Sequence, residues 1–402
     1  MNLDKKMIKN NIPRIRFNNF EAFWVENRIA DIVKISAGGD VDKVKLKESG
    51  KYPVVANSLT NKGIVGFYDD YKVKSPAVTV TGRGDVGYAV ARHENFTPIV
   101  RLLTLQSEKI DVDYLENQIN SMRILNESTG VPQLTAPQLG NYKVYYPKIE
   151  EQSAIGSLFR TLDDLLVSYN DNLTNYQSLK ATMLSKMFPK AGQTVPEIRL
   201  EDFEGEWEKT TLEKSTDRVK SYSLSRDVET NQNTGLKYIH YGDIHLGKVS
   251  MIDDGNSIPY IKTDTKLSEF LQQGDLIFAD ASEDYKGIAE VAVVVTALSE
   301  KIVAGLHTIA VRPQSIFDSI FLYYMFKTQT FRKYGYKVGT GMKVFGISPS
   351  NLMKYEFHYP DKKEQQAIGS YFSNLDQLIT SYQEKISQLE TLKKKLLQDM
   401  FI

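Results

Sequence analysis

Residues 147–188 read PKIEEQSAIGSLFRTLDDLLVSYNDNLTNYQSLKATMLSKMF, and residues 360–401 read PDKKEQQAIGSYFSNLDQLITSYQEKISQLETLKKKLLQDMF. The two stretches align without a gap and are identical at 18 of 42 positions, at an offset of 213. In both of them, apolar residues recur at steps of three and four, and no proline follows the first residue. This spacing predicts one long helix with a narrow apolar seam in each copy.

A second, shorter repeat stands in front of each long one. Residues 13–24 and 196–207 share the pattern PxIRxxxFExxW, at an offset of 183, and they contain the chain's only two tryptophans. The segments between the repeated borders have little resemblance to each other, and the second is longer by 30 residues, the difference between the two offsets. A duplication that keeps its borders and varies its filling predicts one framework that holds two different binding domains.

We therefore predict an α+β protein with a pseudo-twofold internal repeat. Its two globular domains are expected at residues 1–146 and 191–359, and its two long helices, paired as an antiparallel coiled coil, at 147–190 and 360–402. The stretch PKAGQTVP, which starts at Pro189, has the composition of a linker between the halves. The same apolar spacing also fits the alternative of an ordinary core helix in each domain.

The composition limits the classes to which this chain can belong. Its 402 residues are enough for two domains, each with its own core. Because there is no cysteine, a disulfide scaffold, a thiolate nucleophile and a cysteine-based zinc site are excluded. No stretch resembles a signal peptide or a membrane span of about 20 apolar residues, so we expect a soluble, cytoplasmic protein without membrane contact. Its 50 basic and 50 acidic residues balance, but an average can hide local patches.

The first variable segment contains the string GRGDVG at residues 82–87, which fits the GxGxxG template of dinucleotide-binding turns. The next residues, 88–93, alternate like a strand, whereas a dinucleotide site needs a helix whose N-terminus holds the pyrophosphate. We therefore predict no cofactor here, and we expect a glycine-rich loop that contacts a polyanion. The predicted DNA contacts in this segment are Asn61, Lys62, Arg83 and Arg92.

The second variable segment contains a concentration of positive charge. Residues 301–354 hold eight Lys or Arg and a single acidic residue, Asp318, with aromatic residues between them. Basic residues that bind phosphates, together with side chains on loops that reach base edges, are typical of a DNA-binding surface. A solvated basic face over an aromatic core is the alternative. The predicted DNA contacts here are Lys286, Arg332, Lys333, Lys337 and Lys343.

Acidic residues and a histidine also occur in loops of this segment. Asp280, Glu283 and Asp284 follow a predicted strand, as the residues at 82–87 do in the first segment. We interpret them as loop-shaping groups or as acceptors for the amino group of cytosine. His307 lies between two predicted strands and is either a structural histidine or a ligand contact.

Motifs that would indicate catalysis are absent from the sequence. We find no phosphate-binding GxxxxGK[ST] loop, no Asn-Pro-Pro-aromatic or Asp-Pro-Pro-Tyr motif of amino-methyltransferases, and no nucleophile elbow. The histidines lack the spacing of a metal site such as HExxH. The sequence therefore predicts a non-catalytic protein without a cofactor or metal of its own.

The repeated borders resemble the framework of the DNA-specificity subunit of type I restriction-modification systems. The resemblance rests on the PxIRxxxFExxW and EQxAIGS motifs and extends over essentially the whole chain, twice. It implies that each variable segment is a target-recognition domain that reads one half of a bipartite double-stranded DNA site. The two helices would set the gap between the half-sites.

The resemblance also implies partner proteins. Two modification subunits would bind S-adenosylmethionine and methylate adenine, and two restriction subunits would use ATP and Mg to translocate and cut DNA. The alternative from another class is a non-catalytic coiled-coil adaptor whose globular domains bind peptides. A metal-dependent nuclease is a third reading, which cleavage by the purified chain alone would establish.

Overall fold

The computed structural model describes residues 12–124, 133–254, 258–282, 288–341 and 345–402. The predicted contacts Lys286 and Lys343, and the acidic residues Glu283 and Asp284, lie outside the described residues. The chain divides into two compact units. Unit 1 comprises residues 1–172 and 382–402, and unit 2 comprises residues 173–381.

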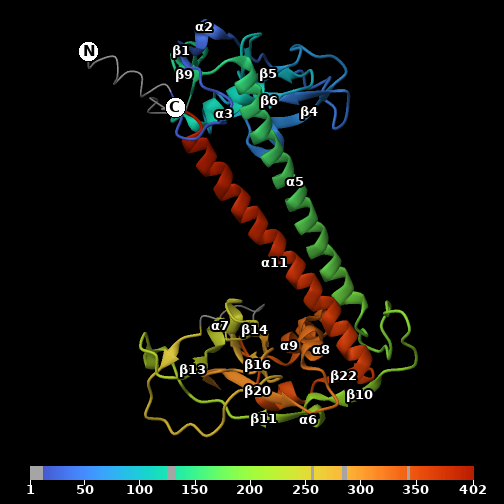
Figure 1. Ribbon diagram of the computed structural model, residues 1–402. Helices are drawn as coiled ribbons and strands as arrows, with labels where there is room; N and C mark the ends of the chain where they lie inside the picture. The colour runs from blue at the N-terminus through green and yellow to red at the C-terminus, as the bar shows by residue number, and fades with distance from the viewer. Residues whose placement is uncertain (1–11, 125–132, 255–257, 283–287, 342–344) are drawn as a thin grey trace. The chain divides into compact units, whose positions relative to one another are not determined.

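Unit 1 is built on two small sheets (Figure 1). The first sheet is antiparallel and has the order β2 (Lys34–Ala37), β8 (Leu103–Gln106), β5 (Ala77–Val80) and β6 (Ala89–Arg92). The second has the order β4 (Ile64–Tyr68), β3 (Tyr52–Val55) and β7 (Thr97–Pro98), with β3 and β7 parallel. The helix α3 (Val112–Ser121) packs on β5 and β6. Because β5 is covered on both faces, its sequence AVTV is almost wholly apolar and every residue in it is buried.

Unit 2 repeats this plan with more strands. Its first sheet has the order β11 (Thr216–Val219), β20 (Thr308–Pro313), β16 (Leu276–Ala279), β18 (Val291–Val294) and β14 (Met251–Ile252). Its second has the order β12 (Glu229–Thr230), β15 (Tyr260–Ile261), β13 (Leu236–Ile239) and β19 (Lys301–Ala304), with β13 and β19 parallel. The helix α8 (Ser319–Lys327) packs on β18, and α9 (Gln329–Val338) packs on α8.

Short elements complete each unit. In unit 1 these are β1 (Val25–Arg28) paired with β9 (Lys143–Tyr146), and the helices α2 (Ile29–Ile32), η1 (Thr60–Gly63) and α4 (Ala136–Gly140). In unit 2 they are β10 (Glu208–Thr211) paired with β22 (Glu356–Tyr359), β17 (Ala281–Ser282) paired with β21 (Phe345–Gly346), and the helices α6 (Leu212–Ser215), η2 (Arg226–Val228), α7 (Tyr241–His245) and α10 (Pro349–Met353).

The two variable segments share one strand framework. The order β2-β8-β5-β6 in unit 1 matches β11-β20-β16-β18 in unit 2, and the parallel pair β3–β7 matches β13–β19. The matching strands also follow one another in the same order along the chain. Segments with little sequence resemblance therefore fold on the same plan, because each supplies short apolar strands at the same places.

The long helices lie where the apolar spacing predicts them, α5 at Ile149–Lys186 and α11 at Lys362–Asp399. In unit 1 the first part of α5 contacts the last part of α11, through an ion pair between Asp163 and Lys393 and through the rings of Tyr169 and Tyr382, 5.6 Å apart. In unit 2 the last part of α5 contacts the first part of α11, through an ion pair between Lys180 and Asp376. Within unit 1 the two helix segments are thus antiparallel.

The repeated EQxAIG motif anchors the start of each long helix. In α5 the buried Gln152 accepts a hydrogen bond from the backbone N–H of Asp111 at 2.9 Å, and Gly156 lets the helix approach the first turn of α3. Gln365 of α11 accepts a hydrogen bond from the backbone N–H of Asp318, also at 2.9 Å, in front of α8. The motif is repeated because each helix docks on its own unit through the same contacts.

The paired tryptophans lie in the core beside the helix ends. In unit 1 Trp24 packs against Tyr114, while Phe401 packs against Phe159 with ring centroids 5.6 Å apart. The counterparts in unit 2 are Trp207 against Phe321 and Phe188 against Phe372. The end of each long helix therefore packs into the unit that holds the start of the other helix. Among the described residues, no helix is long and apolar enough to cross a membrane.

Candidate nucleic-acid interface

Three loops of unit 1 meet at one end of its sheets. They follow β3, β5 and β7, and the side chain of Asn57 joins them: its Nδ2 donates to the backbone O of Val100, and its Oδ1 accepts from the backbone N of Gly82, both at 2.7 Å. The third of these loops also lies directly against the second. A Cβ at Gly82 would come within 3.2 Å of the carbonyl oxygen of Arg101 and 3.0 Å of that of Leu134, closer than an ordinary contact. One amide side chain thus fixes the relative positions of three loops.

Several non-glycine residues in these loops have left-handed backbone conformations. The φ angles are 48° at Asn61, 49° at Lys62, 52° at Val100 and 59° at Arg101, and all four residues are exposed. Such conformations are unfavourable for residues with a Cβ and are concentrated at functional sites, where the surrounding structure holds them in place. The exposed ends of the three loops therefore form a candidate ligand surface.

The four residues predicted to contact DNA in the first segment differ in their exposure. Asn61 and Lys62 lie exposed in η1, and Arg83 lies partly exposed in the loop after β5. Arg92, at the end of β6, is only 7% exposed. Its Nε donates to Thr79 Oγ1 at 3.0 Å and its Nη2 donates to the backbone O of Lys62 at 2.6 Å.

Arg92 is therefore an internal tie between β6, β5 and η1. Its burial disfavours the charged form and lowers the pKa of its guanidinium to about 10. The predicted role of Arg92 as a direct DNA contact is not supported by this position, because the guanidinium faces protein oxygens. The residue acts instead on the loop that carries Lys62.

Sequence reasoning passed over Asn57 and Arg101. Arg101 is exposed, and none of the described residues forms a hydrogen bond or ion pair with its guanidinium. Neither residue belongs to a recognisable motif, since their proximity depends on the parallel pairing of β3 with β7, strands that are far apart in the sequence. The only sequence signal is the change from strand to turn composition after each of these strands.

Unit 2 brings together the corresponding three loops, which follow β13, β16 and β19. The backbone N of Tyr241 donates to the O of Leu306 at 3.3 Å, and the backbone N of Asp280 donates to the O of His307 at 3.0 Å. The side chains of His307 and Asp280 also meet, with Nδ1 and Oδ1 3.1 Å apart, and the ring of Tyr241 lies edge-on to that of His307. Burial raises the pKa of Asp280, and the nearby His307 opposes this effect.

The basic segment 301–354 is less exposed than its composition suggests. Arg312 forms a bidentate ion pair with Asp275, whose carboxylate is fully buried, and Lys327 pairs with Glu290 at 2.7 Å. Arg332, predicted as a DNA contact, is only 8% exposed; it donates to the backbone O of Ile288 and pairs with Glu290. This position does not support direct contact between Arg332 and DNA.

Lys333 and Lys337 lie on the opposite, exposed face of α9. They line a groove of about 900 Å³ together with Lys209, Lys354 and the linker at 189–194. The groove is thus made from the linker and from residues of α8, α9, β10 and β22, whereas Asp280 and His307 belong to the loops after β16 and β19. Lys333 and Lys337 therefore lie on a different surface of unit 2 from the cluster of loops.

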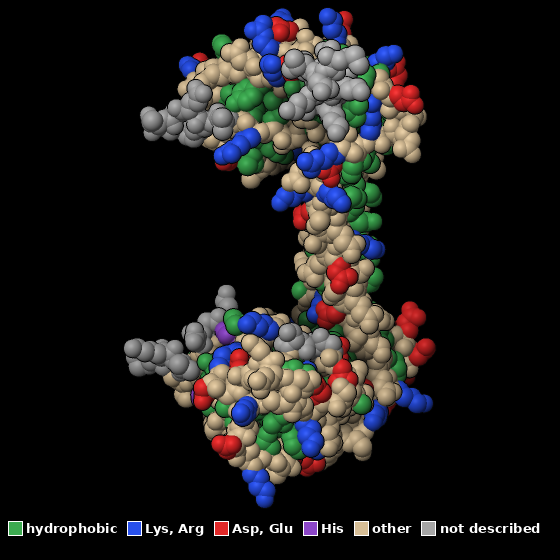
Figure 2. Space-filling view, turned by 60° about the vertical axis from the view of Figure 1, so that its left-hand side comes forward, with side chains coloured by type: hydrophobic (Ala, Val, Ile, Leu, Met, Phe, Trp, Pro, Cys, Tyr) green, Lys and Arg blue, Asp and Glu red, His purple; other side chains and the backbone are tan. Residues whose placement is uncertain are grey.

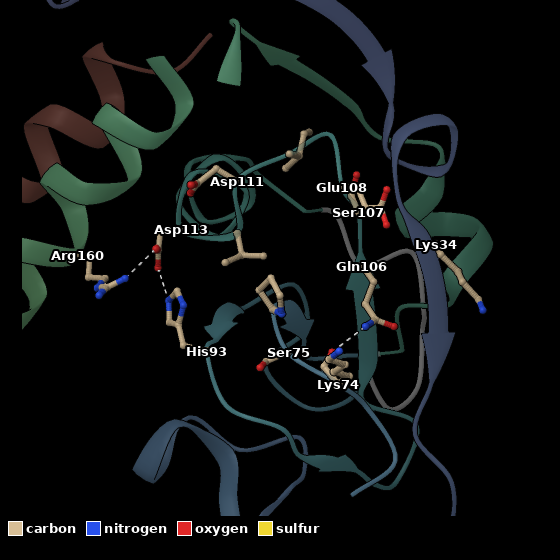
Figure 3. A pocket seen from close by; sticks show the side chains of 13 residues that line it. Lys34, Lys74, Ser75, His93, Gln106, Ser107, Glu108, Asp111, Asp113 and Arg160 are labelled. Carbon is tan, nitrogen blue, oxygen red and sulfur yellow. Dashed lines mark hydrogen bonds and ion pairs between the residues drawn. The ribbon is translucent and has the colours of Figure 1, made fainter. Parts of the chain in front are cut away.

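A polar cavity of about 920 Å³ in unit 1 contains none of the predicted contacts. In it, Asp113 lies between His93 and Arg160, with Oδ1 2.8 Å from His93 Nε2 and Oδ2 3.4 Å from Arg160 Nη1 (Figure 3). These three residues connect the end of β6 with α3 and α5, which indicates a structural role. Within the described part of the chain, no cluster of His, Asp and Glu could hold a metal ion.

The surface charge does not by itself mark a binding face. On the face of each unit that Figure 2 shows, Lys and Arg side chains are interspersed with Asp and Glu. That face therefore has no continuous basic surface that would attract DNA regardless of its sequence.

The comparisons with known proteins define the class of this chain. Residues 22–175 and 204–391 both match the family described as type I restriction modification DNA specificity domain. These two ranges take in most of the chain, so the protein belongs to this family. It is a non-catalytic DNA-specificity subunit of a type I restriction-modification system.

One relative matches nearly the whole chain, and another matches part of it. The type I restriction enzyme MjaVIII specificity subunit of Methanocaldococcus jannaschii is 21% identical over 399 residues, which cover 93% of this chain and 91% of that protein. A Mycoplasma pneumoniae protein named as a type I specificity subunit, S.MpnORF507P, is 26% identical over 159 residues, but these cover only 38% of this chain and 43% of that protein.

Solved structures agree in fold. The crystal structure of the S subunit of the type I restriction-modification system from M. genitalium superposes with a TM-score of 0.66 and 18% identity, covering 97% of this chain and 99% of that one. This likeness supports a mixed α/β fold with two domains. The peptide-binding adaptor and the independent nuclease, the alternatives from sequence alone, are set aside by the family match.

Proposed function

We propose that unit 1 and unit 2 each read one half of a bipartite double-stranded DNA site. The target-recognition domains would be residues 1–146 and 191–359, and residues 147–190 and 360–402 would pair along their length as an antiparallel coiled coil with pseudo-twofold symmetry. The coiled coil would set the gap between the half-sites. The protein would act in the cytoplasm, where its DNA substrate lies.

The chemistry would belong to partners. Two modification subunits would bind S-adenosylmethionine and methylate adenine in the recognised site, and two restriction subunits would use ATP and Mg to translocate and cut DNA. In support, the buried EQxAIG and tryptophan contacts build the same framework twice in one chain. A framework that is built twice would present similar surroundings to two identical partners.

One observation carries the proposal for two different half-sites. The strand order is the same in both units, but the side chains at the loop ends differ, with Arg83 and Arg101 in unit 1 and Asp280 and His307 in unit 2. Base edges in the major groove differ in their donors and acceptors, so different loop chemistry on one framework fits two different half-sites.

Among the predicted contacts, exposure favours Asn61, Lys62 and Arg83 in unit 1 and Lys333 and Lys337 in unit 2. Lysines in such positions would bind phosphates and strengthen binding to all sequences alike, whereas an arginine or asparagine can bond to two atoms of one base. Lys286 and Lys343 stay predictions.

The test is to co-express this chain with its modification subunits and map the methylated sequences. We expect one motif made of two short specified blocks around an unspecified gap. A hybrid in which residues 17–146 come from a relative should change only one block. A continuous motif, or a hybrid that changes both blocks, would contradict the proposal.

A further inference from the structure

We propose that Arg101 and His307 occupy equivalent positions and determine which base is read in each half-site, with Asp280 completing the site in unit 2. This inference rests on the proposed function and names the side chains that carry it out. It is drawn from a comparison of the two units with each other.

The backbone hydrogen bonds establish the equivalence of the two positions. Ile99 N donates to Val55 O at 2.9 Å in unit 1, and Gly305 N donates to Ile239 O at 2.8 Å in unit 2. In both units this bond closes the parallel strand pair, and the left-handed residue follows two positions later, Arg101 after Ile99 and His307 after Gly305.

The register of the larger sheets gives the same alignment. Leu103 pairs with Val80 in unit 1, and Ile309 pairs with Phe278 in unit 2. Arg101 stands two residues before Leu103, and His307 stands two residues before Ile309. Val80 and Phe278 therefore correspond, as do Gly82 and Asp280, two residues further on. In agreement, Gly82 O accepts from Leu134 N at 2.9 Å, and Asp280 O accepts from Ile347 N at 2.8 Å.

The backbone conformation indicates that these side chains are needed. Arg101 has φ 59° and His307 has φ 56°, where glycine would fit without strain. A residue with a Cβ costs roughly 1 to 2 kcal/mol in this region. Both units have this unfavourable conformation at the same position. In each unit the residue there is polar and exposed, and it lies beside the loop after β5 or β16.

The chemistry differs between the two positions. Arg101 stands beside Gly82, which has no side chain, and its guanidinium has no partner among the described residues. A free guanidinium fork matches the O6 and N7 acceptors of guanine. We therefore assign a guanine contact to Arg101.

In unit 2 the position of Gly82 is taken by Asp280, whose carboxylate meets His307 Nδ1 at 3.1 Å. A neutral imidazole that donates from Nδ1 keeps an acceptor lone pair on Nε2, and the carboxylate keeps a second acceptor oxygen. Such acceptors suit an exocyclic amino group, which adenine and cytosine present in the major groove. Unit 2 therefore reads a base with an amino group at this point.

The test is methylation mapping of variants co-expressed with the modification subunits. Arg101→Ala should reduce discrimination at one base of the first half-site by about 10- to 100-fold and leave the second half-site unchanged. Asp280→Ala and His307→Ala should relax one base of the second half-site and leave the first unchanged. In each variant the untouched half-site is the internal control.

Glycine variants guard against loss of folding. Arg101→Gly and His307→Gly relieve the backbone strain, so they should fold at least as well as the wild type and still lose discrimination. Full discrimination at every base in these two variants would overturn the assignment. If the wild type shows no bipartite motif at all, the proposed function fails instead, and this outcome is distinct from a bipartite motif that the variants do not change.

Discussion

Glu364, fully buried at the start of α11, accepts two hydrogen bonds from Arg199, at 2.7 Å from Nε and 2.6 Å from Nη2. The first half of the chain contains the same arrangement, in which Arg16 donates to Glu151 at 2.6 and 2.7 Å. The arginine comes from the tryptophan border and the glutamate from the EQxAIG motif. The two repeated borders of each half are thus joined by one buried ion pair.

Removing the arginine should therefore be costly. Arg199→Ala leaves the carboxylate of Glu364 buried without its partner, and such losses lower the free energy of unfolding by about 3 to 5 kcal/mol. Chemical denaturation measures the change. As the control, Arg28→Ala breaks an exposed pair with Asp31 and should have a much smaller effect, because solvent screens that pair. Equal effects of the two substitutions would contradict the role given to the buried pair.

The glycine of the EQxAIG motif should resist substitution more strongly in the first copy. A Cβ at Gly156 would lie 2.7 Å from Asp111 Oδ1 and 2.9 Å from the backbone N of Tyr114, whereas at Gly369 the nearest atoms are 3.2 Å away. Alanine normally stabilises a helix interior by about 1 kcal/mol relative to glycine. We expect Gly156→Ala to destabilise unit 1 by about 1 to 3 kcal/mol, as overpacking does.

Gly369→Ala is the matched comparison, because the same motif stands there with more room. Its effect on the free energy of unfolding should be clearly smaller. Hydrogen exchange of the amides in α3 and α8 would assign each change to its own unit. A larger loss from Gly369→Ala would show that the clearances do not control the outcome.

Burial raises the pKa of Glu116 from an ordinary 4.5 to about 7, with Asp163 and Asp113 adding to the rise and Lys393 and a backbone N–H opposing it. Well below pH 4.5 this carboxyl is protonated in the folded and the unfolded chain alike. As the pH rises towards 7 the unfolded chain ionises first, so the free energy of unfolding falls, by up to about 3 kcal/mol, and stays low above pH 7.

Glu116→Gln should remove this dependence. Its melting temperature should equal that of the wild type near pH 4 and exceed it near pH 8, when both are followed by circular dichroism. Glu94→Gln, at an exposed position just after β6, serves as the control. A constant difference between Glu116→Gln and the wild type across this pH range would exclude the titration of Glu116 as the cause.

The sequence predicts the framework better than the interface, and the reason lies in the range of the contacts. The helices α5 and α11 follow from a local period of apolar residues, and the duplication itself marks their limits. By contrast, the meeting of Asn57 with Gly82 and Val100 depends on strands paired across more than 40 residues. No local pattern encodes that pairing.

Arg92 and Arg332 show why counting basic residues is a poor guide to a binding surface. Each arginine stands next to another polar or charged residue in the sequence, as exposed residues often do. In the folded chain, however, each guanidinium is buried and donates to a backbone oxygen from a distant part of the sequence. The duplication is a better guide, because it predicts that the two variable segments have equivalent positions. Which residues are equivalent, such as Arg101 and His307, becomes clear only when the strands of the two units are matched.

The role of Arg92 can be separated from DNA binding in one experiment. Arg92→Ala leaves the Lys62 carbonyl and the Thr79 hydroxyl without their donor, so we expect the free energy of unfolding to fall by about 2 kcal/mol. The salt dependence of DNA binding by the assembled complex should not change, because Arg92 neutralises no phosphate. Lys62→Ala should behave in the opposite way: unchanged stability, but a log–log salt slope reduced by about one. A reduced salt slope in Arg92→Ala, with an unchanged melting temperature, would restore Arg92 as a direct DNA contact.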